Sequence, residues 1–264
     1  DKPRTAIWAG MGMGKTSSTL TALETMYLAG ESRPTLVLAP LRVCNSTWPE
    51  EAHKWAHLTE IDVQPVTGDE KNRLAALKRD VSIYACNYQN IPWLVDHYGA
   101  HWPFGTVVAD ESTRLKSFRL RQGGVRAQAL AKVAHKNVKR FINLTGTPAP
   151  NGLQDLWGQT WFLDAGQRLG RTYSAFTDRW FCRTADGFGR ELRSQSAADE
   201  IYNKLRDICL TIEARDWFDL NEPIVKEIEV EMPRSARRLY DQLKKDLILQ
   251  IEQHTITAAN AAVK

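Results

Sequence analysis

The feature that most constrains this chain is a run of small residues between an apolar segment and a helical pattern. The apolar segment is Thr5–Ala9 and the helical pattern is Lys15–Leu28, and between them lies the run Ala9-Gly10-Met11-Gly12-Met13-Gly14-Lys15-Thr16. Small residues let backbone N–H groups converge on phosphate oxygens at a helix N-terminus. A strand, a glycine-rich loop and a helix in this order therefore predict a phosphate-binding loop, the Walker A motif.

The chemistry of this loop assigns a role to each polar residue. Lys15 is expected to reach the β- and γ-phosphates of ATP, and the Thr16 hydroxyl is expected to ligate Mg²⁺. Backbone contacts to ATP are expected over the whole run from Met11 to Thr16, which also contains Gly12, Met13 and Gly14. Ala9 stands where the consensus has its first glycine, a small departure. A glycine turn with an incidental Lys-Thr pair is the alternative, and the agreement of strand, loop and helix disfavours it.

A second motif ends another apolar segment in two carboxylates. Thr106–Ala109 is followed by Asp110 and Glu111. Ligands of open α/β sheets lie beyond the carboxyl ends of strands. We expect Asp110 to hold Mg²⁺ and Glu111 to polarise the attacking water as general base. Such pairs are often solvated turn residues, so this assignment depends on the phosphate-binding loop.

A third motif also follows a predicted strand. It runs from Asn143 to Pro148 and contains Thr145, Gly146 and Thr147. Hydroxyl groups at this place could couple the state of the γ-phosphate to a neighbouring segment. On spacing alone a simple turn fits equally well, because Thr-Gly and Thr-Pro are common turn dipeptides.

Residues 1–150 alternate short apolar segments with amphipathic ones. The expected strands are Thr5–Ala9, Thr35–Ala39, Ile61–Val66, Val81–Ala85, Thr106–Ala109 and Arg140–Leu144. The expected helices are Lys15–Leu28, Ser46–His57, Asp69–Arg79, Tyr88–Tyr98 and Gly123–Ala134. This alternation predicts an α/β lobe, a parallel sheet with helices on both faces.

Residues 151–264 are expected to form a mainly helical protrusion that returns to the lobe. Asn151 is a candidate cap for a helix with an apolar stripe at Leu153, Leu156, Trp157 and Trp161. A helix over Ala197–Cys209, a strand over Ile224–Val230 and a helix from Arg234 to about His254 are expected to follow.

Composition excludes several classes of protein. The 264 residues are 43% hydrophobic and 25% charged, which excludes a disordered chain. No apolar run reaches the roughly 18 residues of a membrane helix, so no membrane partner is expected. The four cysteines form no C-x-x-C pair, which favours the reducing cytoplasm, or a nucleoid or nucleus where DNA lies. From Ser112 to Gln154 the chain has no acidic residue, and this basic stretch, with Lys116 near its start, suits a duplex backbone or a solvated surface equally.

These motifs together resemble the Swi/Snf-like branch of helicase superfamily two, over nearly the whole chain. Residues 11–16 are similar to M-G-L-G-K-T, and residues 38–55 are similar to a strand ending in P-L before a W-x-x-E helix. Residues 110–117 are similar to D-E-A-H-R-I-K-N, and residues 144–157 to L-T-G-T-P-I-Q-N-N-L-E-E-L-W. The last match is long and specific, and it favours the coupling role of Thr145, Gly146 and Thr147.

The resemblance implies an ATP-driven motor on double-stranded DNA with two RecA-like lobes. This chain would be the first lobe and its helical protrusion, and a second lobe of the same parent chain would supply arginines. The resemblance also implies DNA backbone contacts at Pro40, Leu41, Arg42, Asn87 and Tyr88. Such a lobe is expected to bind nucleotide weakly and to hydrolyse it poorly alone.

The sequence departs from the family pattern and leaves alternatives open. Thr113 stands where the family has histidine, so the link between hydrolysis and DNA is expected to be built differently. The family's adenine-reading glutamine would precede Asp1. A strand-separating helicase, a restriction-type translocase subunit, a P-loop switch without hydrolysis and a small-molecule kinase remain as alternative functions.

Overall fold

The computed structural model describes residues 2–58, 61–184, 189–213, 216 and 226–253. The chain divides into two compact units, Asp1–Asp219 and Leu220–Lys264. Within the described residues the second unit contains the helix α9, Arg234–Gln253, which confirms the helix expected there. His254, the expected last residue of that helix, lies outside the described residues.

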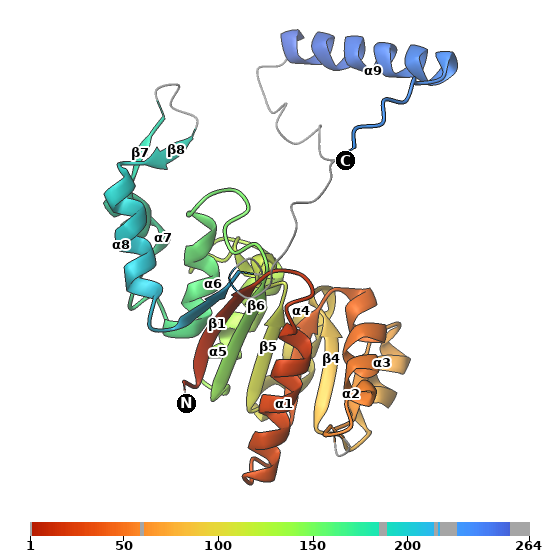
Figure 1. Ribbon diagram of the computed structural model, residues 1–264, viewed down its shortest axis with the longest axis vertical. Coiled ribbons are helices and arrows are strands. Elements are labelled where there is room, and N and C mark those ends of the chain that lie inside the picture. The colour runs from red at the N-terminus through yellow and green to blue at the C-terminus, as the bar shows by residue number, and fades with distance from the viewer. Residues whose placement is uncertain (1, 59–60, 185–188, 214–215, 217–225, 254–264) are drawn as a thin grey trace. The chain divides into compact units, whose positions relative to one another are not determined.

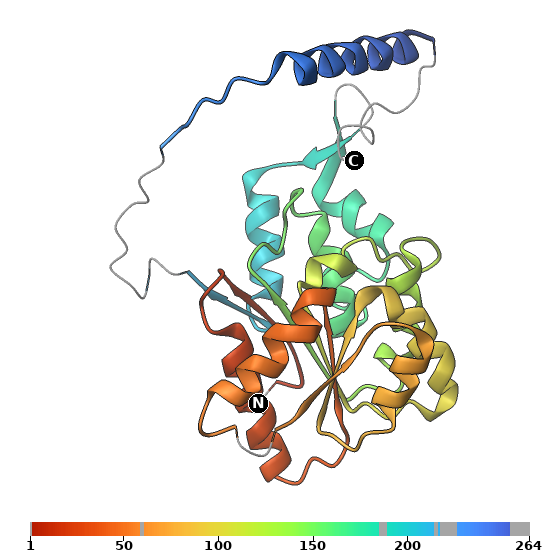
Figure 2. The ribbon, with the colours of Figure 1, turned by 90° about the vertical axis from the view of Figure 1, so that its right-hand side faces the viewer.

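A parallel sheet forms the centre of the first unit (Figure 1). Its seven strands are in the order β3-β4-β2-β5-β6-β1-β9, and every neighbouring pair is parallel. The strands are β1 Arg4–Ala9, β2 Thr35–Ala39, β3 Val63–Val66, β4 Ile83–Asn87, β5 Thr106–Asp110, β6 Arg140–Thr145 and β9 Cys209–Ile212. The turned view of Figure 2 shows the twist of the sheet. The predicted α/β class is confirmed, and the first six strands lie where they were expected with small shifts of their ends.

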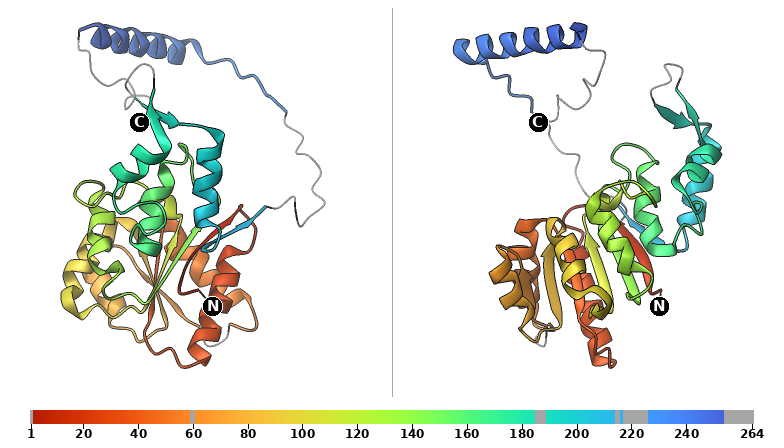
Figure 3. Two further views of the ribbon diagram at one scale, coloured as in Figure 1. Left: turned by 90° about the vertical axis from the view of Figure 1, so that its left-hand side faces the viewer. Right: turned by 180° about the vertical axis from the view of Figure 1, so that it is seen from behind.

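Helices cover both faces of this sheet, so it separates two hydrophobic cores. In β2, Val37 and Ala39 face one core while Leu36 and Leu38 face the other, and all four are buried. Helices α1 Lys15–Leu28 and α2 Trp48–Lys54 pack on the first face. Helices α3 Glu70–Leu77, α4 Ile91–Tyr98 and α5 Val125–Ala134 contribute to the second core, and Figure 3 shows α4 and α5 over that face. Burial on both faces explains why these strands are almost wholly apolar.

The chain leaves the sheet after β6 and later returns to its edge. Helices α6 Asp155–Asp164, α7 Tyr173–Trp180 and α8 Gln195–Leu205 lie in this excursion. Between α7 and α8, β7 Phe181–Arg183 and β8 Arg190–Leu192 form an antiparallel pair that the sequence did not predict. Figure 1 shows α7, α8 and this pair extending past the carboxyl edge of the sheet.

The return to the sheet corrects the helix expected over Ala197–Cys209. The Ser194 hydroxyl accepts from the backbone N–H of Ala197 and caps α8, which ends at Leu205. Cys209 then begins β9, which pairs with β1 from Ala6↔Cys209 to Ala9↔Ile212. The short run Cys209–Ile212 supplies a seventh strand, because the edge of β1 offers backbone partners that a longer helix could not satisfy.

Two further expectations are wrong in detail. Asn151 does not cap α6, which begins at Asp155 with Gln154 at its N-cap; instead the Asp155 carboxylate accepts from the Asn151 backbone N–H at 3.0 Å. Residues 226–230 of the strand expected over Ile224–Val230 are not in a strand, and residues 224 and 225 lie outside the described part of the chain. Ile228 and Val230 are 77% and 86% exposed, so no packing favours the extended pattern there.

Candidate active site

Three neighbouring strands bring the three predicted motifs to one edge of the sheet. β6 lies between β1 and β5, with Trp8 opposite Thr145 and Asp110 opposite Leu144. The phosphate-binding loop after β1, the threonine turn after β6 and the carboxylates that end β5 are therefore side by side. A strand placed between those of the loop and the carboxylates leaves room for a ligand across their ends.

The loop after β1 has the conformation that phosphate binding requires. Gly12 and Gly14 have φ of 75° and 72°, a region that favours glycine, and α1 begins at Lys15. The Lys15 ammonium donates to the carbonyl oxygens of Ala9 and Gly10 at 2.7 and 2.8 Å, so it is held inside the loop. Thr16 lies half-buried in the first turn of α1. This cradle of backbone and one ammonium group fits a chain of phosphates.

Asp110 is held at the carboxyl end of β5 by two donors. Its Oδ2 accepts from the Trp48 indole N–H at 3.0 Å, and its Oδ1 accepts from the Glu111 backbone N–H at 3.1 Å. Burial raises the pKa of this carboxyl and the charge of Glu111 raises it further, while the Trp48 hydrogen bond and the Lys15 charge lower it. A buried carboxylate that is oriented in this way is suited to hold a divalent cation.

Glu111 differs from its neighbour in both exposure and backbone conformation. Its side chain is exposed and its φ is 57°, one of two positive values among the described non-glycine residues. Such a conformation costs free energy in a residue with a Cβ, and it is found preferentially at functional sites. The turn directs the chain from β5 into a 3₁₀ segment, Ser112–Leu115, and leaves the carboxylate open to solvent.

The threonine turn lies directly against the phosphate-binding loop. A Cβ added at Gly146 would be 3.3 Å from the Ala9 carbonyl oxygen. Thr145 is fully buried, and its hydroxyl accepts from the Thr147 backbone N–H at 3.1 Å. The contact makes the position of this turn sensitive to the position of the loop.

Gln159 of α6 connects the segment after Glu111 to the threonine turn, and sequence reasoning missed it. Its Oε1 accepts from the Ser112 hydroxyl at 2.8 Å, and its Nε2 donates to the Pro148 carbonyl at 2.7 Å. Its own carbonyl accepts from the Asn143 amide at 3.0 Å. α6 also buries Thr160 and Asp164, so no pattern in the sequence distinguished Gln159.

The residues expected to contact DNA lie on other strand ends of the same edge. Pro40, Leu41 and Arg42 follow β2, and Leu41 is 50% exposed. Asn87 and Tyr88 are buried at the end of β4, where the Tyr88 hydroxyl donates to the Asp110 carbonyl at 2.8 Å. Their contacts with DNA stay a prediction.

The basic stretch that follows Glu111 is partly engaged within the protein. The Lys116 ammonium pairs with Asp155 of α6 at 3.1 Å, and the DNA contact predicted for it is untested. The guanidinium carbon of Arg119 lies 3.4 Å from the centroid of the Tyr173 ring, and Arg119 donates to the carbonyls of Lys116 and Phe118.

The part of the chain that the structure describes contains no helix with the length and hydrophobicity needed to span a membrane.

Comparisons with known proteins identify the family of the chain. The model of the SNF2-related domain matches residues 7–262. Putative protein p41 of Acyrthosiphon pisum secondary endosymbiont phage 1 is 57% identical over the whole chain, which spans 58% of that protein. Helicase SWR1 of Saccharomyces cerevisiae is 28% identical over 76% of the chain and 14% of the helicase.

A solved structure shares the fold. The Sulfolobus solfataricus SWI2/SNF2 ATPase core in complex with dsDNA superposes with a TM-score of 0.62 at 22% identity, over 97% of this chain and 50% of that one. The chain thus spans 58% of the phage protein, 14% of the yeast helicase and half of the Sulfolobus core. With the family model matching almost from end to end, the chain belongs to the SNF2-related domain family, as its motifs predicted.

Proposed function

We propose that this chain is the first motor lobe of an ATP-dependent double-stranded DNA translocase, and that it binds Mg-ATP at the edge formed by β1, β6 and β5. The observation that carries the proposal is the convergence of the Lys15 loop, the buried Asp110 carboxylate and the Thr145 turn on three adjacent strand ends. Membership of the SNF2-related family supports ATP hydrolysis as the kind of reaction.

Different residues of the site have different roles in binding and hydrolysing ATP. Backbone N–H groups of residues 11–16 and the Lys15 ammonium bind the phosphates, and Lys15 leaves its two carbonyl partners to do so. Thr16 and Asp110 would hold Mg²⁺, which neutralises developing charge on the phosphates. The exposed Glu111 carboxylate takes the proton of the attacking water.

The relatives support the proposal of two partners. The Sulfolobus core was solved with double-stranded DNA, and by analogy we assign the duplex backbone to this chain, with Pro40, Leu41 and Arg42 as contacts. Backbone contacts position a motor without reading sequence. Because the chain spans half of that core, we also assign to it a second RecA-like lobe that completes the ATP site.

The test is phosphate release from Mg-ATP with and without duplex DNA, for the chain and for its Lys15→Ala and Glu111→Gln variants. Release that DNA stimulates and that both variants lose supports the motor, and it contradicts the need for a second lobe. Little release, with Mg-ATP binding that only Lys15→Ala abolishes, supports an isolated first lobe. Release that neither variant changes, or a failure to bind Mg-ATP, contradicts the proposal.

A further inference from the structure

Gln159 of α6 is a buried amide that bonds two segments of the candidate site at once. Its Oε1 accepts from the hydroxyl of Ser112, the residue that follows Glu111, and its Nε2 donates to the carbonyl of Pro148 at the end of the threonine turn. Gln159 is 4% exposed and Ser112 is fully buried, so water does not compete for these bonds. One amide group therefore sets the spacing between the segment after β5 and the turn after β6. None of the roles assigned above uses Gln159 or Ser112.

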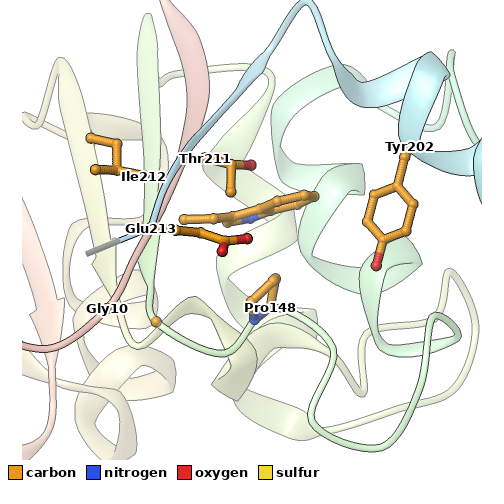
Figure 4. A pocket seen from close by; sticks show the side chains of 8 residues that line it. Gly10, Pro148, Tyr202, Thr211, Ile212 and Glu213 are labelled. Carbon is orange, nitrogen blue, oxygen red and sulfur yellow. The ribbon is translucent and has the colours of Figure 1, made fainter. Parts of the chain in front are cut away.

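The threonine turn borders open space, so its position depends on the contacts that hold it. A Cβ at Gly146 would be 3.3 Å from the Ala9 carbonyl oxygen, which places the phosphate-binding loop on one side of the turn. On another side is a hollow of about 770 Å³, and Gly10, Gly146 and Pro148 are among the residues that line it. Figure 4 shows Pro148 at the edge of this hollow, with Tyr202 of α8 on another side. Because the hollow leaves the turn room to shift, the bond from α6 to its last carbonyl restrains it.

Stability alone does not explain why α6 carries an amide at this place. Asn143 of β6 donates through Nδ2 to the Gln159 carbonyl at 3.0 Å, but its Oδ1 is buried and has no hydrogen-bond partner among the described residues. A buried acceptor without a partner costs free energy, whereas apolar packing between α6 and the sheet would avoid that cost. A polar cluster that is kept in spite of this cost points to a role in the site.

The bond between Ser112 and Gln159 is also absent from the pattern that the motifs resemble. Ser112 stands where that pattern has alanine, which has no side-chain donor, and Thr113 stands where it has histidine. Gln159 lies beyond the third matched segment, which ends at Trp157. Both partners of the bond are therefore features of this chain.

We propose that Gln159 is a positioning residue, which holds the segment after Glu111 and the threonine turn at the spacing that the terminal phosphate of ATP requires. The inference rests on the proposed function, in which Glu111 acts on the water that attacks this phosphate. ADP lacks the terminal phosphate. Loss of the Gln159 bonds therefore weakens the binding of a nucleoside triphosphate and leaves the binding of a diphosphate unchanged.

The test compares Mg-ADP with the magnesium complex of the β,γ-imido analogue of ATP, by titration calorimetry on the whole chain. Gln159→Met keeps an unbranched side chain of similar length and removes both bonds. It is expected to raise the dissociation constant of the analogue about tenfold and to leave that of Mg-ADP unchanged. Gln154→Met is the matched control, because the Gln154 amide bonds the Arg190 carbonyl and the Tyr173 hydroxyl instead of the two site segments. It is expected to keep both dissociation constants.

Ser112→Ala keeps the test decisive if Gln159→Met fails to fold. This variant removes one hydroxyl and is expected to weaken the analogue about fivefold, again without a change for Mg-ADP. In a chain with both changes the two losses should not add, since either change alone breaks the same bond.

Equal losses for the two ligands would show that Gln159 only supports the fold, and unchanged affinity for the analogue would show that it supports nothing at the site. A parent chain that binds both ligands equally well would also overturn the inference, because no contact with the terminal phosphate would then exist to be positioned. If the parent chain binds neither ligand, or if Lys15→Ala binds both as well as the parent does, the proposed function fails instead.

Discussion

Gly158 lies where α6 crosses the segment that follows Glu111, and an added methyl group there tests that contact. A Cβ at this position would be 2.6 Å from the Lys116 carbonyl oxygen and 2.7 Å from that of Leu115. Both neighbours are backbone atoms, so no side-chain rotation relieves the clash. Gly158→Ala must displace either α6 or the turn after Glu111.

The expected change in the free energy of unfolding of Gly158→Ala is the difference between two opposing effects. Alanine in place of glycine inside a helix stabilises it by about 1 kcal/mol. Forcing an extra carbon into a packed region costs about 1–3 kcal/mol, and the backbone clash places Gly158→Ala in the upper part of that range. We expect a net loss of about 1–2 kcal/mol in the free energy of unfolding, or roughly 2–8 °C in the melting temperature of a unit of this size.

Urea denaturation followed by circular dichroism measures this loss. Asn203→Ala in the exposed face of α8 is the control, because it gains helix propensity without a clash and should be unchanged or slightly more stable. If Gly158→Ala is as stable as the parent chain, the contact between α6 and the Lys116 carbonyl is wrong. In the proposed function the same variant lowers hydrolysis more than Mg-ATP binding, since the displaced segment directly follows Glu111.

Three more changes have defined outcomes. Arg4→Met removes donors at 2.5–2.8 Å to the carbonyls of Ala134 in α5, Val138 after α5 and Phe162 in α6, so urea denaturation should show a loss of about 2–4 kcal/mol in the free energy of unfolding. Trp48→Phe removes a donor to Asp110 and raises the pKa of that carboxyl, so magnesium-dependent ATP binding should fail at a higher pH during acid titration. The Arg168 hydrogen bond lowers the pKa of Asp207 from 3.8 to about 2. The stabilisation that the ionised Asp207 gives the folded state is therefore complete above about pH 4 and is lost as the pH falls to about 2. Asp207→Asn should flatten the unfolding free energy over this range, and salt should reduce the difference because the side chain is half exposed.

The lobe was predictable because its signals are local. An apolar strand, a glycine loop and the Lys15 helix occupy consecutive residues, and burial on both faces makes each central strand apolar. The order of the strands, which the sequence alone did not predict, then places Asp110 and Thr145 beside the loop. For these elements a short window of sequence contains most of the physical cause.

The remaining features depend on partners distant in the sequence. β9 is four residues long, and its conformation is set by pairing with β1 about 200 residues earlier. Asn151 is of a residue type that often caps helices. Its backbone N–H instead donates to the Asp155 carboxylate, and α6 starts only at Asp155. Gln159 shows its role only when Ser112 and Pro148 are both in place around it. Side chains that connect separate motifs have no local pattern to reveal them.

Equilibrium binding of ATP to the 264-residue chain, with and without Mg²⁺, tests the central claim most directly. Lys15→Ala removes the ammonium that the loop holds, and Lys71→Ala on the exposed surface of α3 is the control. The account predicts magnesium-dependent binding that Lys15→Ala abolishes and Lys71→Ala leaves intact. Binding of equal strength in the parent chain and in Lys15→Ala would contradict it.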